Sequence, residues 1–298
     1  MPYGKLYEKL DDRFGPCMDG DVRLEQLYGD CRWAEGPVYV PAGRYLAWSD
    51  IPNDRMLRWD EITGEVGVLR SPAGNTNGHT LDRSGRLVSC EHGNRRVSRT
   101  EYDGSVVTLA DRFEGKRFNS PNDVVVHSDD SIWFTDPTYG IRSDYEGWQS
   151  QAEIGAQNVY RLDPATGECR VVEGDMAQPN GLAFSLDEKL LYVSDSERNE
   201  MRLFDVGADG TLSGSRIFAT CTAGCFDGFR LDNAGRIWTS AADGVHCYDP
   251  DGTLLGKIVV PETVANVVFG GLKRNHLFIC ATTSVYALKV SVTGAKTV

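Results

Sequence analysis

The chain has 298 residues, of which 41% are hydrophobic, and it carries a formal net charge of -12 at pH 7. This composition provides enough apolar residues for a large core, and no 18-residue apolar run predicts a membrane-spanning helix. The acidic balance argues against nucleic acid or an anionic membrane surface as a partner, because both require a positively charged footprint.

Two features predict a cytoplasmic protein. The first residues, Met1-Pro2-Tyr3-Gly4-Lys5, lack the apolar segment of a secretory signal. The eight cysteines are scattered, and several fall inside expected strands, where buried free thiols are common. We therefore expect free thiols, a reducing compartment and a monomer or small homo-oligomer.

The first part of the chain predicts an arm followed by an edge strand. In residues 1–21, Leu6, Leu10 and Phe14 recur at helical spacing. Residues 22–28 then alternate apolar and polar side chains, which is typical of a strand with one buried face. We expect an N-terminal arm over residues 1–21 and one domain over residues 22–298.

The rest of the chain contains an internal repeat. Each copy begins with a polar residue that opens an apolar strand, and the copies start at Glu35, Asn77, Asn122, Asn180, Asp227 and Asn266. A turn rich in Asp, Gly, Ser or Pro follows, and then a second apolar strand, at residues 45–48, 87–90, 132–135, 190–193, 237–240 and 276–280. The steps between copies are 42, 45, 58, 47 and 39 residues, roughly the length of one four-stranded propeller blade.

The repeat therefore predicts an all-β, six-bladed β-propeller. After the strand at residues 285–290, only a polar tail remains to complete the last blade. We expect residues 22–28 to supply its outer strand, so that an N-terminal strand closes the ring. The third repeat is the longest, and its insertion at residues 138–157 is interpreted either as a solvated loop or as a lid over one face.

The residues that open the repeats predict a metal site. Rotation about the propeller axis brings them together at one end of the channel, and all six carry side-chain oxygen. Two carboxylates and four amides without a cation would leave charge poorly compensated, whereas Ca²⁺ accepts such oxygen ligands. Neither Cys nor His occurs at this position, which favours Ca²⁺ over Zn²⁺; Zn²⁺, Mg²⁺ and Mn²⁺ remain alternatives. Two simpler interpretations are turn residues that merely enter strands, and a structural ion without catalysis.

Two further residues are candidates from their positions alone. His79 stands two residues after Asn77, where the other repeats have apolar residues, and its pKa range suits a base at neutral pH. The alternative is a histidine held by hydrogen bonds between blades. Arg95 lies in a loop and is a candidate for contact with substrate hydroxyls, or else a solvated or ion-paired residue.

Several phrases of the sequence resemble one known family. They are Glu35-Gly36-Pro37, Ser49-Asp50-Ile51-Pro52-Asn53, Cys90-Glu91-His92-Gly93-Asn94-Arg95-Arg96, Arg117-Phe118-Asn119-Ser120-Pro121-Asn122-Asp123, Phe134-Thr135-Asp136-Pro137 and Pro179-Asn180-Gly181. As a set, from about Trp33 to Leu288, they resemble the gluconolactonase, senescence marker protein (regucalcin) and luciferin-regenerating-enzyme family, most of all bacterial gluconolactonases. The resemblance implies a six-bladed propeller with a catalytic divalent ion, usually calcium, and lactone hydrolysis.

The resemblance also implies roles for individual residues. Glu35, Asn180 and Asp227 match the family's metal ligands, and Asp227 is its candidate base or nucleophile. Asn122 and Asp123 match an Asn-Asp motif that contacts substrate or metal. The regucalcin branch has a substrate-contacting Arg shortly before this motif; here Ser120 and Pro121 intervene after Arg117, the corresponding candidate. The resemblance does not assign Asn77, which we expect to line the channel and contact substrate, or Asn266.

The resulting hypothesis is a calcium-dependent lactonase that acts on a small sugar-acid lactone such as D-glucono-1,5-lactone. The ion polarises the carbonyl, and Asp227 or His79 activates water. Two alternatives remain open: a phosphotriesterase-like hydrolase on the same site, and a non-catalytic binding platform braced by a structural ion.

Overall fold

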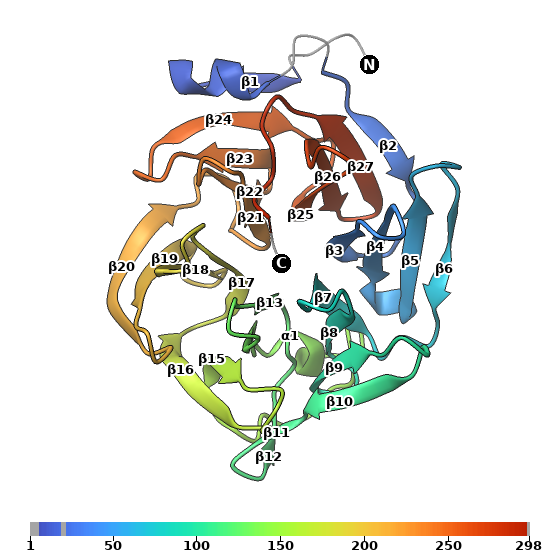
Figure 1. Ribbon diagram of the computed structural model, residues 1–298, viewed down its shortest axis with the longest axis vertical. Helices are drawn as coiled ribbons and strands as arrows, with labels where there is room; N and C mark the ends of the chain where they lie inside the picture. The colour runs from blue at the N-terminus through green and yellow to red at the C-terminus, as the bar shows by residue number, and fades with distance from the viewer. Residues whose placement is uncertain (1–5, 19–21, 297–298) are drawn as a thin grey trace.

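The computed structural model describes residues 6–18 and 22–296. Six antiparallel sheets surround a central channel as the blades of a propeller (Figure 1). The predicted all-β, six-bladed architecture is confirmed. Within the described residues the one α-helix, α1 (Tyr139–Arg142), has four residues, and no helix there is long and apolar enough to cross a membrane.

Each blade runs from an innermost strand beside the channel to an outer strand at the rim. The first three blades are β3 (Ala34–Val40), β4 (Tyr45–Asp50), β5 (Arg55–Asp60) and β6 (Val66–Arg70); β7 (Thr76–Leu81), β8 (Leu87–Glu91), β9 (Arg96–Thr100) and β10 (Val106–Ala110); and β13 (Val124–Val126), β14 (Ile132–Thr135), β15 (Gln157–Leu162) and β16 (Cys169–Met176). A small hairpin of β11 (Arg112–Phe113) and β12 (Lys116–Arg117) joins the second blade to the third, and the short 3-10 helix η2 (Ile51–Asn53) follows β4.

The other three blades share this order. They are β17 (Pro179–Phe184), β18 (Leu190–Asp195), β19 (Glu200–Val206) and β20 (Leu212–Thr220); β21 (Phe229–Leu231), β22 (Ile237–Ala241), β23 (Gly244–Tyr248) and β24 (Leu254–Val259); and β25 (Val264–Gly270), β26 (His276–Ala281) and β27 (Ser284–Lys289), with β2 (Glu25–Tyr28) as the fourth strand. All six second strands expected from the repeat are present, as β4, β8, β14, β18, β22 and β26.

The ring closes between the two ends of the chain, as predicted. The N-terminal strand β2 pairs antiparallel with β27, with Glu25 opposite Ala287 and Gln26 opposite Tyr286. Figure 1 shows the blue β2 beside the red β27. The last blade therefore contains the beginning and the end of the propeller.

The N-terminal arm differs from the helical pattern in its sequence. Instead of one helix, it forms the strand β1 (Tyr7–Lys9), which pairs with β24, and the 3-10 helix η1 (Asp12–Cys17). Phe14 is fully buried and its ring lies 6.1 Å from that of Trp238 in the fifth blade. The helical spacing failed because edge pairing and one buried aromatic side chain position this segment. The expected boundary at residue 21 lies outside the described residues.

Hydrophobic clusters fill five of the six interfaces between blades. Trp48 and Phe278 pack between the sixth and first blades, and Trp238 and Phe269 pack between the fifth and sixth. Three further clusters lie between the second and third, third and fourth, and fourth and fifth blades. Within the part of the chain described here, no such cluster lies between the first and second blades.

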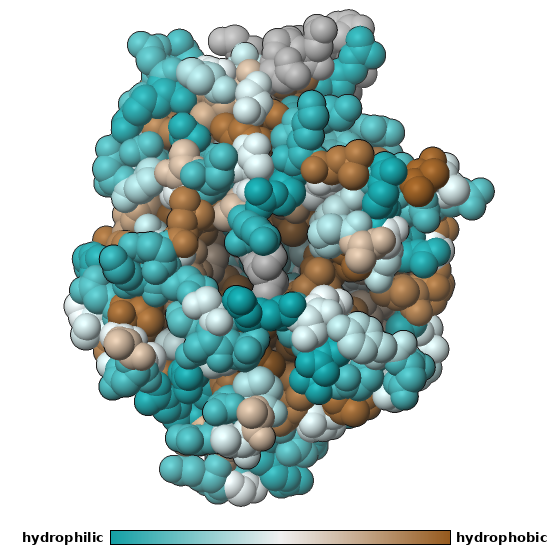
Figure 2. Space-filling view, viewed as in Figure 1, coloured by the Kyte–Doolittle hydropathy of each residue, from teal (hydrophilic) through white to brown (hydrophobic). Residues whose placement is uncertain are grey.

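The surface is largely polar. Figure 2 shows a mostly hydrophilic face with small, scattered hydrophobic patches and a hollow near its centre. All eight cysteines lie in the described residues and are free thiols, in agreement with the sequence interpretation.

A candidate metal centre at one end of the channel

The six residues that open the repeats lie at or just before the innermost strands. Glu35, Asn77, Asn122, Asn180 and Asn266 are buried, and Asp227 is partly buried. Contacts between neighbouring blades link these positions, for example from Gly78 to Asn122, from Gly181 to Asp227 and from Asn266 to Glu35. That the six side chains share one metal ion stays a prediction.

A β-bulge at the innermost strand aims several of these side chains at the channel. The pairing register shifts between Glu35 and Val38, between Thr76 and His79, between Pro179 and Leu182, and between Val264 and Asn266. A bulge adds an unpaired residue and re-aims the neighbouring side chains. The polar residue can therefore leave the strand's normal alternation.

The glycine after the channel residue allows the blades to approach closely. The Gly78 N–H donates to the Asn122 carbonyl at 2.7 Å, and a Cβ on Gly78 would lie 2.5 Å from that oxygen. The same relation joins Gly181 to the Asp227 carbonyl, with a Cβ again at 2.5 Å. These Asn-Gly and Asp-Gly pairs are therefore required by inter-blade packing and are not only turn residues.

A hydroxyl on the second strand fixes the next channel residue. The Ser49 hydroxyl donates to the Asn77 carbonyl at 2.9 Å, and the Thr135 hydroxyl donates to the Asn180 carbonyl at 2.7 Å. The Ser194 hydroxyl donates to the Asp227 carbonyl at 2.7 Å. The signal that would have found them is a Ser or Thr directly before the acid at the end of β4, β14 and β18.

Asn266 orients Glu35 across the joint between the sixth and first blades. Its Nδ2 donates to the Glu35 Oε2 at 2.9 Å, and its Oδ1 accepts from the Val267 N–H at 2.8 Å. The backbone N–H of Gly36 also donates to Glu35 Oε2. Because both ends of the Asn266 amide are occupied, this residue supports a ligand and is not itself positioned as one.

The two carboxyl groups of the ring are electrostatically unusual. Burial raises the pKa of Glu35 to about 7, although the hydrogen bonds from Asn266 and Gly36 oppose this shift. Burial also raises the pKa of Asp227 well above its ordinary value, and the charge of Glu35 raises it further. Two like charges in a desolvated site favour protonation, unless a cation compensates them.

Two neighbouring amides use their nitrogen atoms in contacts within the protein. The Asn180 Nδ2 donates to the Ser196 hydroxyl at 3.1 Å, and Ser196 donates to the Phe226 carbonyl at 2.7 Å, so the Asn180 oxygen is turned away from Ser196. On the second blade, the Asn77 Nδ2 lies 3.3 Å from the His92 Nε2.

The donor set fits a hard divalent cation. Glu35 and Asp227 supply two carboxylates, which balance a charge of two, and Asn122 and Asn180 supply amide oxygen. Over residues 6–18 and 22–296, no three His, Cys, Asp or Glu side chains form a metal-binding group. A cation at this end of the channel would therefore depend on the amides as well as on the carboxylates.

Both oxygens of the Asp123 carboxylate are engaged in contacts within the protein. Its Oδ2 lies 3.3 Å from the Arg230 Nη1 and accepts from the Leu182 N–H at 3.4 Å, while its Oδ1 accepts from the Val124 N–H at 2.9 Å. Asp123 thus holds the third blade against the fourth, at the position where four of the other five blades have glycine. The sequence did not identify Arg230 as its partner.

His79 lies between the first and second blades. Its Nε2 is 2.8 Å from the Ser49 hydroxyl and its Nδ1 is 2.8 Å from the Ser89 hydroxyl. Burial lowers the pKa of His79 to about 3. Both ring nitrogens are occupied, which is the hydrogen-bonded alternative considered in the sequence analysis.

Arg95 and Arg117 hold loops on the outer side of the second and third blades. The Arg95 Nε donates to the Phe118 carbonyl at 2.6 Å and its Nη1 donates to the Ser150 hydroxyl at 3.2 Å. The Arg117 Nη2 donates to the Asn94 carbonyl at 3.1 Å. Neither guanidinium forms a hydrogen bond or ion pair with the six channel residues.

The long insertion lies beside the candidate centre. Figure 1 shows α1 close to the middle of the ring, near β7, β8 and β13. A Cβ on Gly140 would lie 2.5 Å from the His92 Cβ, so α1 packs directly on the second blade. The Glu146 Oε2 lies 3.8 Å from the His92 Nδ1, and burial raises the pKa of Glu146 to about 7.

This insertion adds polar groups that the sequence analysis did not single out. The charges of Glu146 and Asp227 influence each other, and burial together with Asp227 raises the pKa of the Tyr139 phenol. A residue in an insertion has no equivalent in the other repeats, so the repeat could not reveal Tyr139 or Glu146. His92 stands in one of the quoted motifs but has no counterpart in the other blades.

Comparisons with known proteins agree with this architecture. Residues 33–283 match the model of the SMP-30/Gluconolactonase/LRE-like region. A gluconolactonase of Zymomonas mobilis is 31% identical, with 98% of this chain and 87% of that protein covered. The solved gluconolactonase XC5397 of Xanthomonas campestris is 39% identical with a TM-score of 0.92, covering 96% of this chain and 95% of that chain.

A more distant structure shares the fold. Regucalcin of Agrobacterium tumefaciens, described as a calcium-binding protein, is 19% identical with a TM-score of 0.76, covering 90% of this chain and 94% of that chain. The family match covers most of the sequence and includes all six residues that open the repeats. The chain therefore belongs to the SMP-30/gluconolactonase/LRE-like family.

Proposed function

We propose that the protein is a metal-dependent hydrolase of a sugar-acid lactone such as D-glucono-1,5-lactone, with Ca²⁺ as the preferred ion. The observation that carries the proposal is the pair of desolvated carboxyl groups, Glu35 and Asp227, set among amides at the channel's end. Family membership and the similarity to gluconolactonases support the lactone as substrate.

The proposed ligands are Glu35, Asn122, Asn180 and Asp227. A bound divalent cation would polarise the lactone carbonyl and favour developing negative charge on its oxygen. Oxygen-only ligands of mixed charge favour Ca²⁺ over Zn²⁺. Asn266 and Ser196 keep Glu35 and Asn180 in their orientations through the hydrogen bonds described above.

Asp227 is the proposed base. It is the more exposed of the two carboxylates, and it accepts the proton of the water that attacks the lactone carbonyl. We assign His79 to a structural role, since both of its nitrogens already contact serine hydroxyls. The insertion that contains α1 is proposed to limit the access of bulk water to the reacting groups, because Tyr139 at the start of α1 interacts with Asp227.

Substrate hydroxyls are proposed to contact the amides of Asn77 and Asn122. Both side chains belong to the ring of channel residues, next to the carboxylates. Asp123, Arg95 and Arg117 were candidates for the same role, but their charged groups are engaged with Arg230, Ser150 and Asn94. The proposal therefore leaves substrate binding to the amides.

One assay tests the proposal. Hydrolysis of D-glucono-1,5-lactone is followed by acid release with the full chain, then after treatment with EGTA, and then after addition of Ca²⁺, Mg²⁺, Mn²⁺ or Zn²⁺. We expect activity to disappear with chelation and to return best with Ca²⁺. A chain that hydrolyses paraoxon but no lactone would identify the phosphotriesterase alternative, and a chain inactive on both substrates would support the binding platform.

The Asp227→Asn variant forms the second arm of the same assay. Loss of a general base typically lowers turnover 10²–10⁴-fold, and we expect a decrease of at least about 100-fold. The variant should keep its thermal stability, because removal of one charge relieves repulsion with Glu35. Near-normal hydrolysis by Asp227→Asn would remove this residue from the mechanism.

A further inference from the structure

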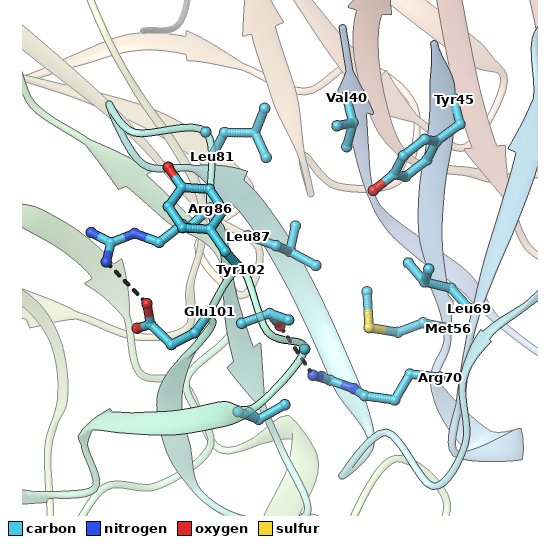
Figure 3. Close-up of a pocket in the computed structure, with 14 residues that line it drawn as sticks. Val40, Tyr45, Met56, Leu69, Arg70, Leu81, Arg86, Leu87, Glu101 and Tyr102 are labelled. Carbon is cyan, nitrogen blue, oxygen red and sulfur yellow. Dashed lines mark hydrogen bonds and ion pairs between the residues drawn. The ribbon is translucent and has the colours of Figure 1, made fainter. Parts of the chain in front are cut away.

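The interface between the first and second blades contains a cavity in place of a hydrophobic cluster. The cavity has a volume of about 390 Å³ and lies between β4, β5 and β6 on one side and β8, β9 and β10 on the other (Figure 3). Small-molecule sites typically measure roughly 300–1,000 Å³. Its residues lie apart from the channel residues, so it is independent of the proposed lactonase site.

The inner part of this interface is polar, whereas the outer part contains the cavity. Next to the channel, Ser49, His79 and Ser89 form a row of hydrogen bonds between the two sheets. Farther out, Figure 3 shows Met56 and Leu69 on one wall and Leu87 on the other. Leu69 remains 36% exposed, so apolar surface is left open between the blades.

Two arginines, Arg70 and Arg86, line the same cavity. Arg86 is paired with Asp82 at 2.7 Å and with Glu101 at 3.0 Å, whereas the neighbours of Arg70 leave it poorly paired. Its Nη1 lies 3.5 Å from the Thr100 hydroxyl and its Nη2 lies 3.4 Å from the Ala73 carbonyl, both at the limit of a hydrogen bond. Its Nε has no hydrogen-bond partner. The guanidinium is mostly buried, and this burial lowers the pKa of Arg70.

The nearest carboxylates do not neutralise Arg70, because other arginines already hold them. The Glu91 Oε1 is 3.9 Å from the Arg70 Nη2, but Arg96 binds both Glu91 oxygens at 2.8 and 3.1 Å. Glu101, which also lines the cavity, accepts from Arg86 at 3.0 Å and from Arg99 at 2.7 Å. A buried cation with long contacts favours an anion that can reach its exposed edge.

We propose that this cavity binds a small amphiphilic carboxylate. The hydrocarbon body lies between Met56, Leu69 and Leu87, and the carboxylate accepts hydrogen bonds from the Arg70 Nη atoms. Apolar burial and a charge-assisted hydrogen bond then act on the two ends of one ligand. The site is a second binding site, between blades, that lies apart from the candidate metal centre.

Decanoate is the probe, with decanol and acetate as controls, and binding to the full chain is measured by calorimetry. We expect decanoate to bind at least about 10-fold more tightly than decanol, which lacks the charge, and acetate, which lacks the chain, not to bind. Decanoate should also raise the melting temperature, because it binds the folded state only. No decanoate binding, or equal binding of decanol, would overturn the proposal.

Matched variants locate the two ends of the ligand. Arg70→Met keeps the side-chain length and should weaken decanoate at least about 10-fold without changing decanol, whereas Arg83→Met, outside the cavity, should change neither. Leu69→Trp should close the cavity, whereas Val68→Trp on the opposite face of β6 should not. Leu69 is partly exposed, so this variant keeps the test open if Arg70→Met does not fold.

A spectroscopic readout places the ligand directly. With ¹³C-methyl methionine, the Met56 methyl resonance should move on addition of decanoate, while that of Met176, in another interface, stays unchanged. Unchanged lactone hydrolysis by Arg70→Met would show that the two sites act independently. Decanoate binding that is insensitive to both Arg70→Met and Leu69→Trp, or that leaves Met56 unchanged, would place the ligand elsewhere and refute the proposal.

Discussion

His79 and Asp227 show how position decides the role of a titratable residue. His79 is fully enclosed between two serine hydroxyls, whereas Asp227 stands at the channel's end beside Glu35 and Asn180. Burial lowers the pKa of the histidine and raises that of the carboxylic acid, so both favour the neutral form when no cation is present. Of the two residues, only Asp227 is partly exposed, and only its carboxyl group becomes negatively charged and can bind a cation.

The lowered pKa of His79 predicts a pH-dependent contribution to stability. Its pKa is about 3 in the folded protein and 6.5 in its ordinary state, so the unfolded chain binds the extra proton between these values. The contribution of neutral His79 to the free energy of unfolding is complete above pH 6.5. It decreases by about 1.4 kcal/mol per pH unit as the pH falls toward the pKa of the folded state.

His79→Gln should remove this dependence. The difference in unfolding free energy between wild type and variant should shrink by about 2 kcal/mol between pH 7 and pH 5, as measured by urea unfolding. All other groups titrate alike in both proteins and cancel in the difference. Between pH 7 and pH 8 the difference should stay constant; a constant difference down to pH 5 would show that His79 is already charged or exposed in the folded state.

The sequence predicted the channel residues but not the partners that fix them. Glu35, Asn180 and Asp227 were identified because the repeat and the family motifs both point to them. The pairing of Asp123 with Arg230 joins residues of the third and fifth blades, which are far apart in the chain. The spacing of residues within one repeat carries no information about contacts between blades.

At the scale of the strands, the close approach of neighbouring blades depends on glycine. Gly181 has its Cα against the Asp227 carbonyl of the next blade, and Gly228 lies against the Asn266 side chain. A side chain at either position would push the innermost strands apart. The polar residue and the glycine after it therefore act as one unit, which brings the innermost strands close together around the proposed metal site.

Gly181→Ala should destabilise the protein and disturb the site together. The added Cβ would lie 2.5 Å from the Asp227 carbonyl, and such overpacking costs about 1–3 kcal/mol. Urea unfolding and lactone hydrolysis should both report the change. Gly67→Ala is the control, because its Cβ meets no atom within 4 Å; an equal effect of both substitutions would disprove the packing role.

The second strands were predictable and the arm was not, for a physical reason. Each second strand is buried on both faces and reads as a continuous apolar run, for instance Ile132-Trp133-Phe134. The strand β1 has three residues at a sheet edge, and only its main-chain pairing and the partly buried Tyr7 define it. Its few side chains produced an accidental helical spacing.

At the scale of the whole molecule, the ring is held by β2 in the last blade. This strand was predicted because the sixth repeat lacks a fourth strand of its own, and a propeller with an unpaired edge is less stable. What the sequence could not predict is the unequal packing around the ring. Among the described residues, five interfaces contain hydrophobic clusters, and the interface between the first and second blades has a polar inner part and a cavity farther out. This difference depends on residues such as Arg70 and His79, whose burial is set by folding.

Deletion of residues 1–30 should destabilise the whole propeller. Loss of β2 exposes the edge of β27 and the apolar side chains beneath it, and we expect the melting temperature to fall by at least about 5 °C. Deletion of residues 1–10, which removes β1 but keeps β2, is the control and should have a smaller effect. Unchanged cooperative melting of the longer deletion would show that the ring does not need this strand.

The pairing of β2 with β27 also determines when this protein finishes folding. Residues 25–28 are synthesised before the other five blades, and their partner, residues 284–289, is synthesised after them. The strand β2 therefore waits, unpaired, while those blades are made, and the loop that its pairing closes contains all of them. Assembly should be late and cooperative, and any truncated product that stops before β27 would keep an open sheet edge that invites aggregation.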